Sequence, residues 1–315
     1  MRTEGMRQGG KASTRAADRA AKVAGITLTN PDRILYPEQR LTKRDLALYY
    51  ESVAEWIMPH LVGRPLTLVR CPEGHDHDCF YQKHANETIP EAIDRVQIEE
   101  EDGGRATYLV ANSISAVLGL VQMGVLEIHT WGSRQDRLDR PDRLIFDLDP
   151  DPDLEWKHVL AVASLTRLLL TELELTSFIK TTGGKGLHIV LPLQRIHTWD
   201  EIKTFAKAVA EFVSRADPSH VIATMAKNKR KRKVYIDYLR NTRGATAVAA
   251  FSTRARPGAT VSVPLSWDEL STDIRSDSFT VKNIGKRLKS LRQDPWKEYY
   301  MVNQRLTKSM WEKLA

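Results

Sequence analysis

The chain has 315 residues, of which 42% are hydrophobic and 28% are charged, and this balance is typical of a folded globular protein. No apolar stretch approaches the roughly 20 residues that a membrane-spanning helix needs, and no apolar segment near Met1 resembles a secretion signal. The net charge of +7 favours a polyanionic partner such as nucleic acid. The 2 cysteines are too few for a disulfide framework and suit a reducing compartment, so we expect a cytoplasmic protein that contacts no membrane.

The start of the chain is rich in Arg, Lys, Gly, Ala, Ser and Thr and shows little apolar periodicity. Segments of this composition bury too little apolar surface to fold by themselves. The sequence therefore predicts a disordered basic tail or linker over residues 1–25, a folded domain over residues 26–300 and a helical extension over residues 301–315.

The folded part begins with an alternating segment, residues 26–37, which predicts an edge strand followed by a loop. Thr42 and Asp45 then have the spacing of a capping box, and apolar residues recur at helical spacing as far as Pro59. Lys43 lies in the first turn of this helix, where a cation opposes the helix dipole. That position indicates a side chain directed at an anion, although a solvated surface lysine is the commoner alternative.

Two predicted strands, residues 66–70 and 79–83, flank a short polar loop. Four possible zinc ligands stand in or beside this loop, namely Cys71, His75, His77 and Cys79. Ligand pairs in structural zinc sites are usually separated by longer segments, so we favour a polar hairpin loop over a zinc site.

The second of these strands contains Phe80, Tyr81 and Lys83, which together offer a stacking face and a cation to nucleic acid. After a short apolar helix, residues 125–129 predict a further strand that ends in His129. A structural histidine and a site histidine are equally consistent with that position.

Residues 143–150 predict a buried strand that ends in two carboxylates. Its apolar run leads into Asp147 and Asp149, and Pro150 ends it. Because side chains two positions apart lie on the same face of a strand, the two carboxylates converge on one spot. Like charges held together raise each other's pKa, so a divalent cation between them explains the pair best. The alternative is a simple Asp-Pro turn.

A glycine-rich loop follows a long apolar helix, residues 154–175, and a short strand. This loop, Thr181-Thr-Gly-Gly-Lys-Gly-Leu-His188, lets the backbone approach a ligand, so that amide groups and one ammonium can contact phosphate oxygens. The spacing differs from a Walker A motif, and a strand follows it instead of a helix. A glycine-rich hairpin turn is the alternative, but Thr182, Lys185 and His188 together favour phosphate binding.

A further amphipathic helix, residues 199–215, has Asp200 as its expected N-cap. A dense basic run, residues 227–233, then leads into a strand on which Asp237 supplies a third carboxylate. Four arginines flank the next predicted strand, residues 246–251: Arg240, Arg243, Arg254 and Arg256. After Pro264 the chain becomes helical and polar, and we recognise no chemistry there.

These features are separated in the sequence, but together they could support one reaction. Two divalent ions held by Asp147, Asp149 and Asp237 could activate a 3′-hydroxyl and neutralise a triphosphate during in-line displacement. The glycine-rich loop and the arginines would hold the phosphates. The sequence therefore predicts nucleotidyl transfer.

From about residue 26 to residue 296 the chain resembles the polymerase domain of bacterial ATP-dependent DNA ligase D, in the archaeo-eukaryotic primase superfamily. The segments FDLDP, TTGGKGLHI, KVYIDYLRN and FSTRAR occur in that family's order. The resemblance implies an α/β fold, a two-lobed primase-polymerase fold with central mixed or antiparallel sheets flanked by helices. It also implies addition of NTPs or dNTPs, preferably ribonucleotides, to 3′ ends at DNA breaks or gaps during non-homologous end joining. Two divalent cations would assist, with Mn²⁺ preferred and Mg²⁺ possible.

The resemblance assigns roles to individual residues. Asp147, Asp149 and Asp237 correspond to the catalytic metal ligands. His129 would lie near the nucleotide sugar, and the other nucleotide-binding residues would be Thr182, Gly184, Lys185, His188, Arg240, Arg254 and Arg256. The family more often has Ser where Thr182 stands, which keeps the hydroxyl. The 5′-phosphate of a downstream strand would be read by Asn30, Arg33 and Lys43, and further DNA contacts would come from Arg70, Phe80, Lys83 and Arg230.

A ligase nucleophile motif and a phosphoesterase module are not recognisable in the chain, so we expect these modules in cis in a longer enzyme or in trans. A Ku-type end-binding protein is the other expected partner, besides DNA ends and gapped DNA. Two other functions stay open. One is a non-catalytic DNA-end tethering module, which the intact carboxylates disfavour. The other is a de novo primase, which only an assay without a 3′-hydroxyl primer would distinguish.

Overall fold

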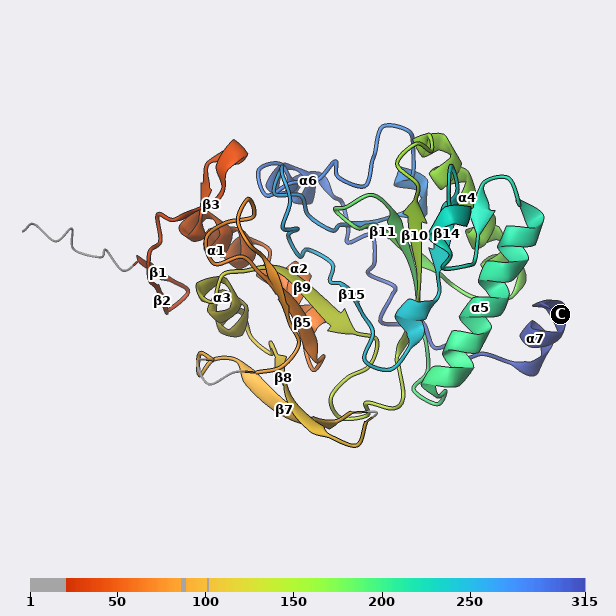
Figure 1. Cartoon of the computed structure of the whole chain (residues 1–315), viewed down its shortest axis with the longest axis horizontal. Coiled ribbons are helices and arrows are strands. Elements are labelled where there is room, and N and C mark those ends of the chain that lie inside the picture. Colours follow the sequence, from red (N-terminus) through yellow and green to blue (C-terminus); the bar gives the residue numbers. More distant parts are fainter. Residues whose placement is uncertain (1–20, 86–88, 101, 315) are drawn as a thin grey trace, which may run out of the picture.

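A computed structural model of the chain describes residues 21–85, 89–100 and 102–314 (Figure 1). Most of the segment expected as a basic tail, residues 1–20, lies outside the described residues. In the last part of that segment, β1 (Ala21–Val23) pairs antiparallel with β2 (Ile26–Leu28). Gly25 has a φ of 82° and makes the tight turn between these strands.

The first lobe is built on a four-stranded sheet with the strand order β15-β9-β5-β6. Its strands are β5 (Leu66–Arg70), β6 (Phe80–Gln82), β9 (Val125–Trp131) and β15 (Thr246–Val248). Two further antiparallel pairs are β3 (Ile34–Tyr36) with β4 (Leu41–Thr42) and β7 (Asp94–Glu99) with β8 (Arg105–Val110). The apolar side chains of the sheet share one core with helices α1 (Lys43–Ser52), α2 (Ala54–Leu61) and α3 (Ile114–Gln122).

The second lobe is built on a six-stranded sheet with the strand order β13-β14-β10-β12-β11-β16. These strands are β10 (Arg143–Pro150), β11 (Phe178–Thr181), β12 (Leu187–Pro192), β13 (Val221–Ile222), β14 (Val234–Asp237) and β16 (Pro264–Leu265). The helices α4 (Trp156–Glu172) and α5 (Trp199–Ala216) cover one side of this sheet (Figure 1). Short helical turns are η1 (Pro37–Gln39), η2 (Lys227–Lys229), η3 (Leu239–Asn241) and η4 (Trp267–Glu269).

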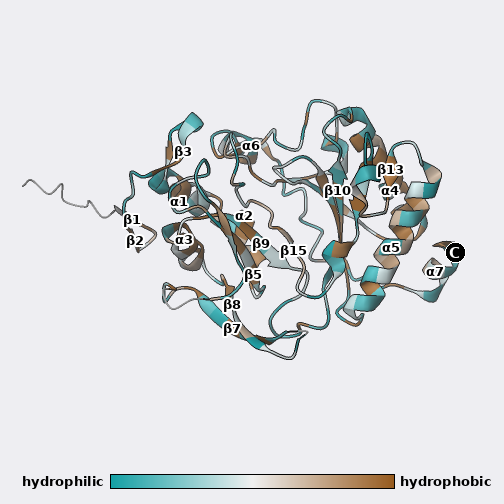
Figure 2. Cartoon of the chain, viewed as in Figure 1, coloured by the Kyte–Doolittle hydropathy of each residue, from teal (hydrophilic) through white to brown (hydrophobic). Residues whose placement is uncertain are grey.

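Helix α5 is held on the sheet by an apolar stripe. Its buried residues recur every three or four positions: Trp199, Ile202, Phe205, Ala206, Val209, Ala210 and Val213. Figure 2 shows hydrophobic and hydrophilic stretches alternating along this helix. The polar remainder of its surface is free to face water.

Side chains of β10 alternate between the two faces of the sheet, and this alternation decides which face carries the polar residues. Leu144, Phe146 and Leu148 point into the core shared with α4 and α5. Ile145 points to the opposite face, where it packs with a separate apolar cluster, and Asp147 lies two positions further along that same face. The side of the six-stranded sheet opposite to α4 and α5 therefore carries the carboxylates.

Two helix boundaries differ from the sequence prediction. The helix expected from Thr42 to Pro59 is divided into α1 and α2 at Val53, with Pro59 inside α2. The N-cap of α5 is Thr198 and not Asp200, because Thr198 forms a reciprocal capping box with Glu201. The capping box predicted at the start of α1 is confirmed.

The end of the chain contributes to both faces of the second lobe. Trp296 and Tyr299 pack on the Ile145 side of the sheet, after α6 (Ile284–Ser290). Helix α7 (Lys308–Leu314) lies in the segment expected as a helical extension, and its Met310 side chain is buried in the core beside α5. In the described part of the chain, no helix is long and apolar enough to cross a membrane.

Candidate active site

Asp147 stands at the centre of a row of polar side chains that crosses the six-stranded sheet. Antiparallel pairing places it opposite His188 of β12 on one side and opposite Asp237 of β14 on the other. Nε2 of His188 lies 3.4 Å from Oδ1 of Asp147. Nε of Arg240 lies 3.1 Å from Oδ2 of Asp147 and 3.4 Å from Oδ2 of Asp237. The guanidinium of Arg240 therefore links the two facing carboxylates.

The three carboxylates have different pKa values because their neighbours differ. Burial opposes the charge of Asp147, but His188 and Arg240 hold the pKa of this carboxyl well below its ordinary value. Burial and the nearby charge of Asp147 raise the pKa of Asp149. Burial also raises the pKa of Asp237, against the charge of Arg240. Burial is therefore the largest influence on all three carboxyls, and only Asp147 has neighbours that outweigh it.

Asn241 fixes the turn that carries Asp237 and Arg240. Its amide oxygen accepts a hydrogen bond from the Ile145 amide at 2.8 Å. Its amide nitrogen donates to the carbonyl oxygens of Ile145 at 2.7 Å and of Tyr238 at 2.8 Å. These bonds hold the turn that follows β14 against strand β10. Sequence analysis missed Asn241, because its partner on β10 lies 96 positions away.

Two glycines shape the loop between β11 and β12. Gly183 has a φ of 66°, which few other residues adopt. A Cβ atom at Gly186 would overlap the carbonyl oxygen of Leu148, so only glycine lets the loop approach β10 this closely. Lys185 is exposed between them, where its ammonium can reach a ligand.

The hydroxyl of Thr182 is bonded inside this loop. It donates to the carbonyl oxygen of Gly186 at 3.0 Å, accepts from the amide of Gly184 at 3.1 Å and lies 3.0 Å from the hydroxyl of Ser276. Thr182 is buried and holds the shape of the loop. Ser276 belongs to the segment after Pro264 in which the sequence showed no chemistry, so its contribution was missed.

The facing wall of the site comes from β9 of the first lobe. Oε2 of Glu127 lies 2.7 Å from Nε2 of His129. Oε1 of Glu127 accepts a hydrogen bond from the Ala255 amide at 2.9 Å and lies 3.1 Å from Nε of Arg254. Although burial opposes the charge of Glu127, these partners lower its pKa to about 2. Glu127, which sequence analysis did not single out, orients two of the predicted nucleotide ligands.

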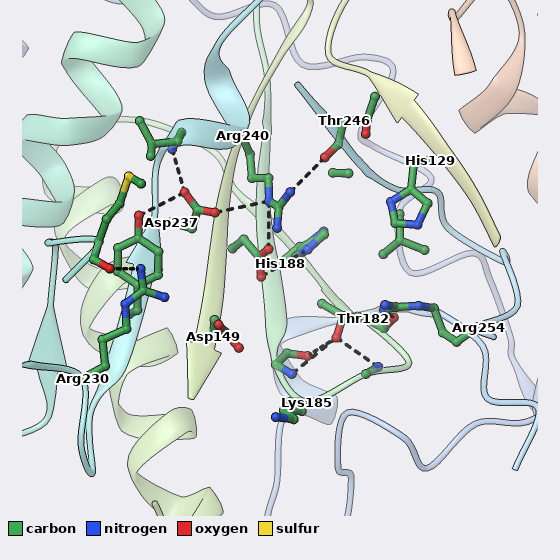
Figure 3. A pocket seen from close by; sticks show the side chains of 18 of the residues that line it. His129, Asp149, Thr182, Lys185, His188, Arg230, Asp237, Arg240, Thr246 and Arg254 are labelled. Atoms are coloured by element: carbon green, nitrogen blue, oxygen red, sulfur yellow. Dashed lines mark hydrogen bonds and ion pairs between the residues drawn. The ribbon is translucent and has the colours of Figure 1, made fainter. Parts of the chain in front are cut away.

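One cavity of about 520 Å³ collects side chains from both lobes (Figure 3). All predicted metal and nucleotide ligands line it: Asp147, Asp149, Asp237, His129, Thr182, Gly184, Lys185, His188, Arg240, Arg254 and Arg256. Arg230, predicted to bind DNA, also lines it and lies 3.7 Å above the ring centre of Tyr235. The structure therefore brings this predicted set together around one space.

The donor chemistry of the three aspartates fits divalent cations. Carboxylate oxygens on adjacent strands are ligands that Mg²⁺ and Mn²⁺ prefer. Among the described residues, however, no group of three or more His, Cys, Asp or Glu side chains already has the arrangement of a metal site. The guanidinium of Arg240 lies against both Asp147 and Asp237. A cation bound there would have to displace it.

Residues 42–296 match the family model described as the LigD primase-polymerase domain. The chain belongs to this family. It is a nucleotidyltransferase domain of the kind named for LigD, and the predicted α/β primase-polymerase fold is confirmed. The chain is also similar to a solved structure, the polymerase domain from Mycobacterium tuberculosis ligase D in complex with DNA. That match has a TM-score of 0.81 at 31% identity and covers 87% of this chain and 97% of that one.

Longer LigD proteins are similar over most of this chain. The multifunctional non-homologous end joining protein LigD of Pseudomonas aeruginosa is 40% identical over 310 residues, which are 98% of this chain and 36% of that protein. The protein with the same description from Mycolicibacterium smegmatis is 34% identical over 78% of this chain and 32% of its own length. The LigD primase-polymerase domain described here thus spans about a third of the length of these relatives.

In this LigD primase-polymerase domain, the three residues expected to bind a 5′-phosphate lie together at the start of α1. The amide of Arg33 donates to the carbonyl oxygen of Asn30 at 3.1 Å, and the amide of Lys43 donates to the carbonyl oxygen of Arg33 at 2.8 Å. Both cations already have partners. Arg33 lies 2.7 Å from Oε1 of Glu73. Lys43 is 5% exposed, donates to the carbonyl oxygen of Thr29 at 3.0 Å, and has its pKa lowered by burial.

Three further residues expected on the DNA side lie along β5 and β6, outside the cavity. Arg70 donates to the carbonyl oxygen of Met123 at 2.9 Å and lies 5.2 Å from the ring centre of Phe80. Lys83 pairs with Glu100 at 2.8 Å. Tyr81 is 77% exposed, more than its neighbour Phe80 at 47%. Phe80 shares its face of the sheet with Arg70, whereas Tyr81 is the next residue of the strand and points to the opposite face.

Cys71 and Cys79 form a disulfide that closes the loop of residues 72–78. The expectation of reduced cysteines was therefore wrong, because the antiparallel register of β5 and β6 brings the two side chains together. His75 pairs with Glu38 at 2.8 Å. With both sulfurs joined and His75 engaged, the zinc alternative is excluded and the polar hairpin loop is confirmed.

Proposed function

We propose that this domain adds nucleotides, preferentially ribonucleotides, to 3′ ends at DNA breaks or gaps during non-homologous end joining, by two-metal phosphoryl transfer. The observation that carries the proposal is the single cavity in which three carboxylates face a glycine-rich loop and several cations. The solved polymerase domain of M. tuberculosis ligase D, described in complex with DNA, supports DNA as the substrate.

Asp147, Asp149 and Asp237 would hold the divalent cations, with Mn²⁺ preferred and Mg²⁺ possible. When bound, such cations lower the pKa of a coordinated hydroxyl and neutralise phosphate charge. Burial and the neighbouring Asp147 charge raise the pKa values of Asp149 and Asp237, and a bound cation would favour the charged form of both carboxyls. His188 orients Asp147 from the neighbouring strand, and burial keeps its own pKa low, at about 4.

The triphosphate would lie along the loop between β11 and β12. Lys185 and Arg256 line the cavity and have no acidic partner among the described residues, so they are available to phosphate oxygens. Nη1 of Arg254 donates a hydrogen bond to the carbonyl oxygen of Thr182 at 2.7 Å, and this bond holds the Arg254 side chain against the loop. Arg240 would move from the two aspartates toward the nucleotide as cations bind.

His129 would face the sugar. Its Nε2 is occupied by Glu127, and its ring lines the cavity opposite the carboxylates. Burial lowers the pKa of His129, so the ring is neutral near pH 7 and its second nitrogen can accept a hydrogen bond. A ribose 2′-hydroxyl is a suitable donor, and a deoxyribose lacks it.

DNA would run from this cavity across the first lobe. The proposed contact for a 5′-phosphate consists of Asn30, Arg33 and Lys43. Lys43 also donates a hydrogen bond to the carbonyl oxygen of Thr29, the residue before Asn30. Exposed Phe80 would stack on a base, and Arg70, Lys83 and Arg230 would contact the backbone. Ligase and phosphoesterase modules, in cis or in trans, and a Ku-type end-binding protein are the proposed partners at the nucleoid.

The deciding experiment is primer extension on a gapped duplex with a 5′-phosphate, with Mn²⁺ and either ribonucleotide or deoxyribonucleotide triphosphates. We expect extension that favours ribonucleotides, and a loss of about a thousandfold or more in Asp147→Asn with DNA binding retained. The exposed Asp153, just beyond the strand, provides the matched control as Asp153→Asn. Tight binding without extension would favour a tethering module, and extension without a primer would favour a de novo primase.

A further inference from the structure

A second cavity, of about 240 Å³, lies behind the glycine-rich loop. It shares three wall residues with the active-site cavity, namely Gly184, Lys185 and Arg256. Its floor is apolar and comes from α4, where Trp156 and Val159 are buried. The two cavities are therefore neighbours that meet along one stretch of loop and one arginine.

The outer wall of this second cavity is a segment that is bonded directly to the loop. The hydroxyl of Ser276 donates to the carbonyl oxygen of Gly186 at 2.6 Å, and the carbonyl oxygen of Ser276 accepts from the Gly183 amide at 3.1 Å. Nε1 of Trp156 donates to the carbonyl oxygen of Ile274 at 2.9 Å. The segment is thus bonded both to the loop and to α4.

The charges around this cavity are unbalanced. Lys185, Arg256 and Arg275 line it, and none of them pairs with a carboxylate within the described residues. Arg275 instead lies 5.5 Å from the ring centre of Trp156, which holds its guanidinium at the cavity wall. Two acids, Asp151 and Asp277, also line the cavity. Three unpaired cations against two acids favour a compact anion over a neutral ligand.

We infer that this second cavity is the binding and exit site for the pyrophosphate that the polymerase reaction releases. The inference rests on the proposed function. In that reaction the 3′-oxygen forms a bond to the α-phosphorus and its proton passes to solvent water. The bond from the α-phosphorus to the bridging oxygen breaks, and its electron pair stays on pyrophosphate. The product starts beside Lys185 and Arg256, which both cavities share.

From there the cations lead outward. Pyrophosphate passes from Lys185 and Arg256 to Arg275, which is exposed and stands where the cavity opens to solvent. Asp277 is also exposed at this opening, and its negative charge weakens the hold on the anion so that it can leave. A route on the far side of the loop leaves the primer and the carboxylates undisturbed during product release.

The test measures inorganic pyrophosphate as a product inhibitor of single-nucleotide addition on gapped DNA. Arg275→Gln should raise the inhibition constant for pyrophosphate roughly tenfold while the KM for the nucleotide changes less than about twofold. Asp277→Asn should lower the inhibition constant roughly threefold, because it removes a repulsive charge. Arg275→Lys should stay close to the wild type, and Arg292→Gln, an exposed arginine elsewhere, is the matched control.

The opposite signs expected for Arg275→Gln and Asp277→Asn distinguish a charge effect from a loss of folding, which a thermal melt of each variant checks. Unchanged inhibition constants would overturn the inference. So would an equal rise of the inhibition constant and the nucleotide KM, because the cavity would then belong to the substrate site. Calorimetric titration of the wild type and Arg275→Gln with inorganic pyrophosphate separates this inference from the proposed function. Binding that depends on Arg275 would support the site even in a chain that adds no nucleotide.

Discussion

In the first lobe, Nε2 of His129 lies 2.7 Å from Oε2 of Glu127, and this contact decides what the other ring nitrogen can do. Because burial lowers the pKa of His129, the neutral ring donates its Nε2 hydrogen to the carboxylate. Nδ1 makes no hydrogen bond within the part of the chain that the structure describes. It is therefore left as an acceptor in a ring that lines the cavity.

Glu127→Gln should reduce the preference for ribonucleotides. A glutamine amide can donate to Nε2, which favours the tautomer whose Nδ1 carries hydrogen and can no longer accept from a 2′-hydroxyl. We expect the ratio of kcat/KM for ribonucleotide over deoxyribonucleotide to fall roughly tenfold. Glu100→Gln is the matched control, because Glu100 also bonds a histidine, His84 at 3.1 Å, outside the cavity. An unchanged ratio in Glu127→Gln would rule out this role.

Arg240→Gln should tighten the binding of Mn²⁺ and weaken that of the nucleotide. The guanidinium lies within 3.4 Å of both Asp147 and Asp237, so it competes with any cation for the same oxygens. Removing one competing positive charge should lower the Kd for Mn²⁺ roughly fivefold, as measured by calorimetry without nucleotide. Arg243→Gln removes a nearby arginine that pairs with Asp139 and should leave the Kd unchanged. Weaker Mn²⁺ binding in Arg240→Gln would contradict the proposed competition.

His60 should make folding stability depend on pH. Burial, together with nearby Arg143 and Lys180, lowers the pKa of His60 from 6.5 to about 3. The unfolded chain therefore binds a proton more readily than the folded one, and stability falls as pH falls from about 6.5 toward about 3. The loss from one such group is at most about 1.4 kcal/mol per pH unit.

Urea unfolding between pH 7 and pH 4 measures this effect. In His60→Gln the number of protons taken up on unfolding should fall by about one, so the unfolding free energy should depend less steeply on pH. Some dependence should remain, because His188 is buried with a pKa of about 4 and contributes with the same sign. His77→Gln removes an exposed histidine and serves as the control. A His60→Gln profile parallel to the wild type would show that His60 is not a titrating group in this range.

Lys43→Ala should weaken binding to gapped DNA only when a 5′-phosphate is present. We expect a loss of roughly tenfold with the phosphate and less than about twofold without it, because a direct charged contact depends on the phosphate itself. Arg44→Gln is the matched control: it neutralises the next residue of α1, which pairs with Asp32 at 3.0 Å. Equal losses on both DNAs would mean that Lys43 supports the fold or contacts DNA without reading its end.

Local sequence patterns predicted the part of the site that depends on local geometry. The alternation around Leu148 placed Asp147 and Asp149 on one face, and both line the cavity. The glycine spacing around Lys185 predicted a close approach of the loop, which Gly186 makes against β10. The resemblance to ligase D then joined these segments, and the cavity contains every residue that it assigned to metal or nucleotide.

Residues that act through distant partners were not predictable in this way. Asn241 and Ser276 gain their roles from partners brought near by tertiary structure, and so does Glu127 through its bond to the Ala255 amide. The disulfide of Cys71 and Cys79 was missed because two cysteines give no hint of pairing until the hairpin register is known. Sequence spacing reports neighbours on one strand or helix, and these contacts join different ones.

The chain crosses between its two sheets more than once. It leaves the first lobe after β9, enters the second at β10, returns for β15 and goes back to form β16. A chimera made with a relative by one crossover point would therefore mix strands within a sheet. A segment exchanged between relatives without mixing strands has to run from the start of α1 to beyond β16. A chimera that preserves the cavity therefore takes both walls of the cavity from the same parent.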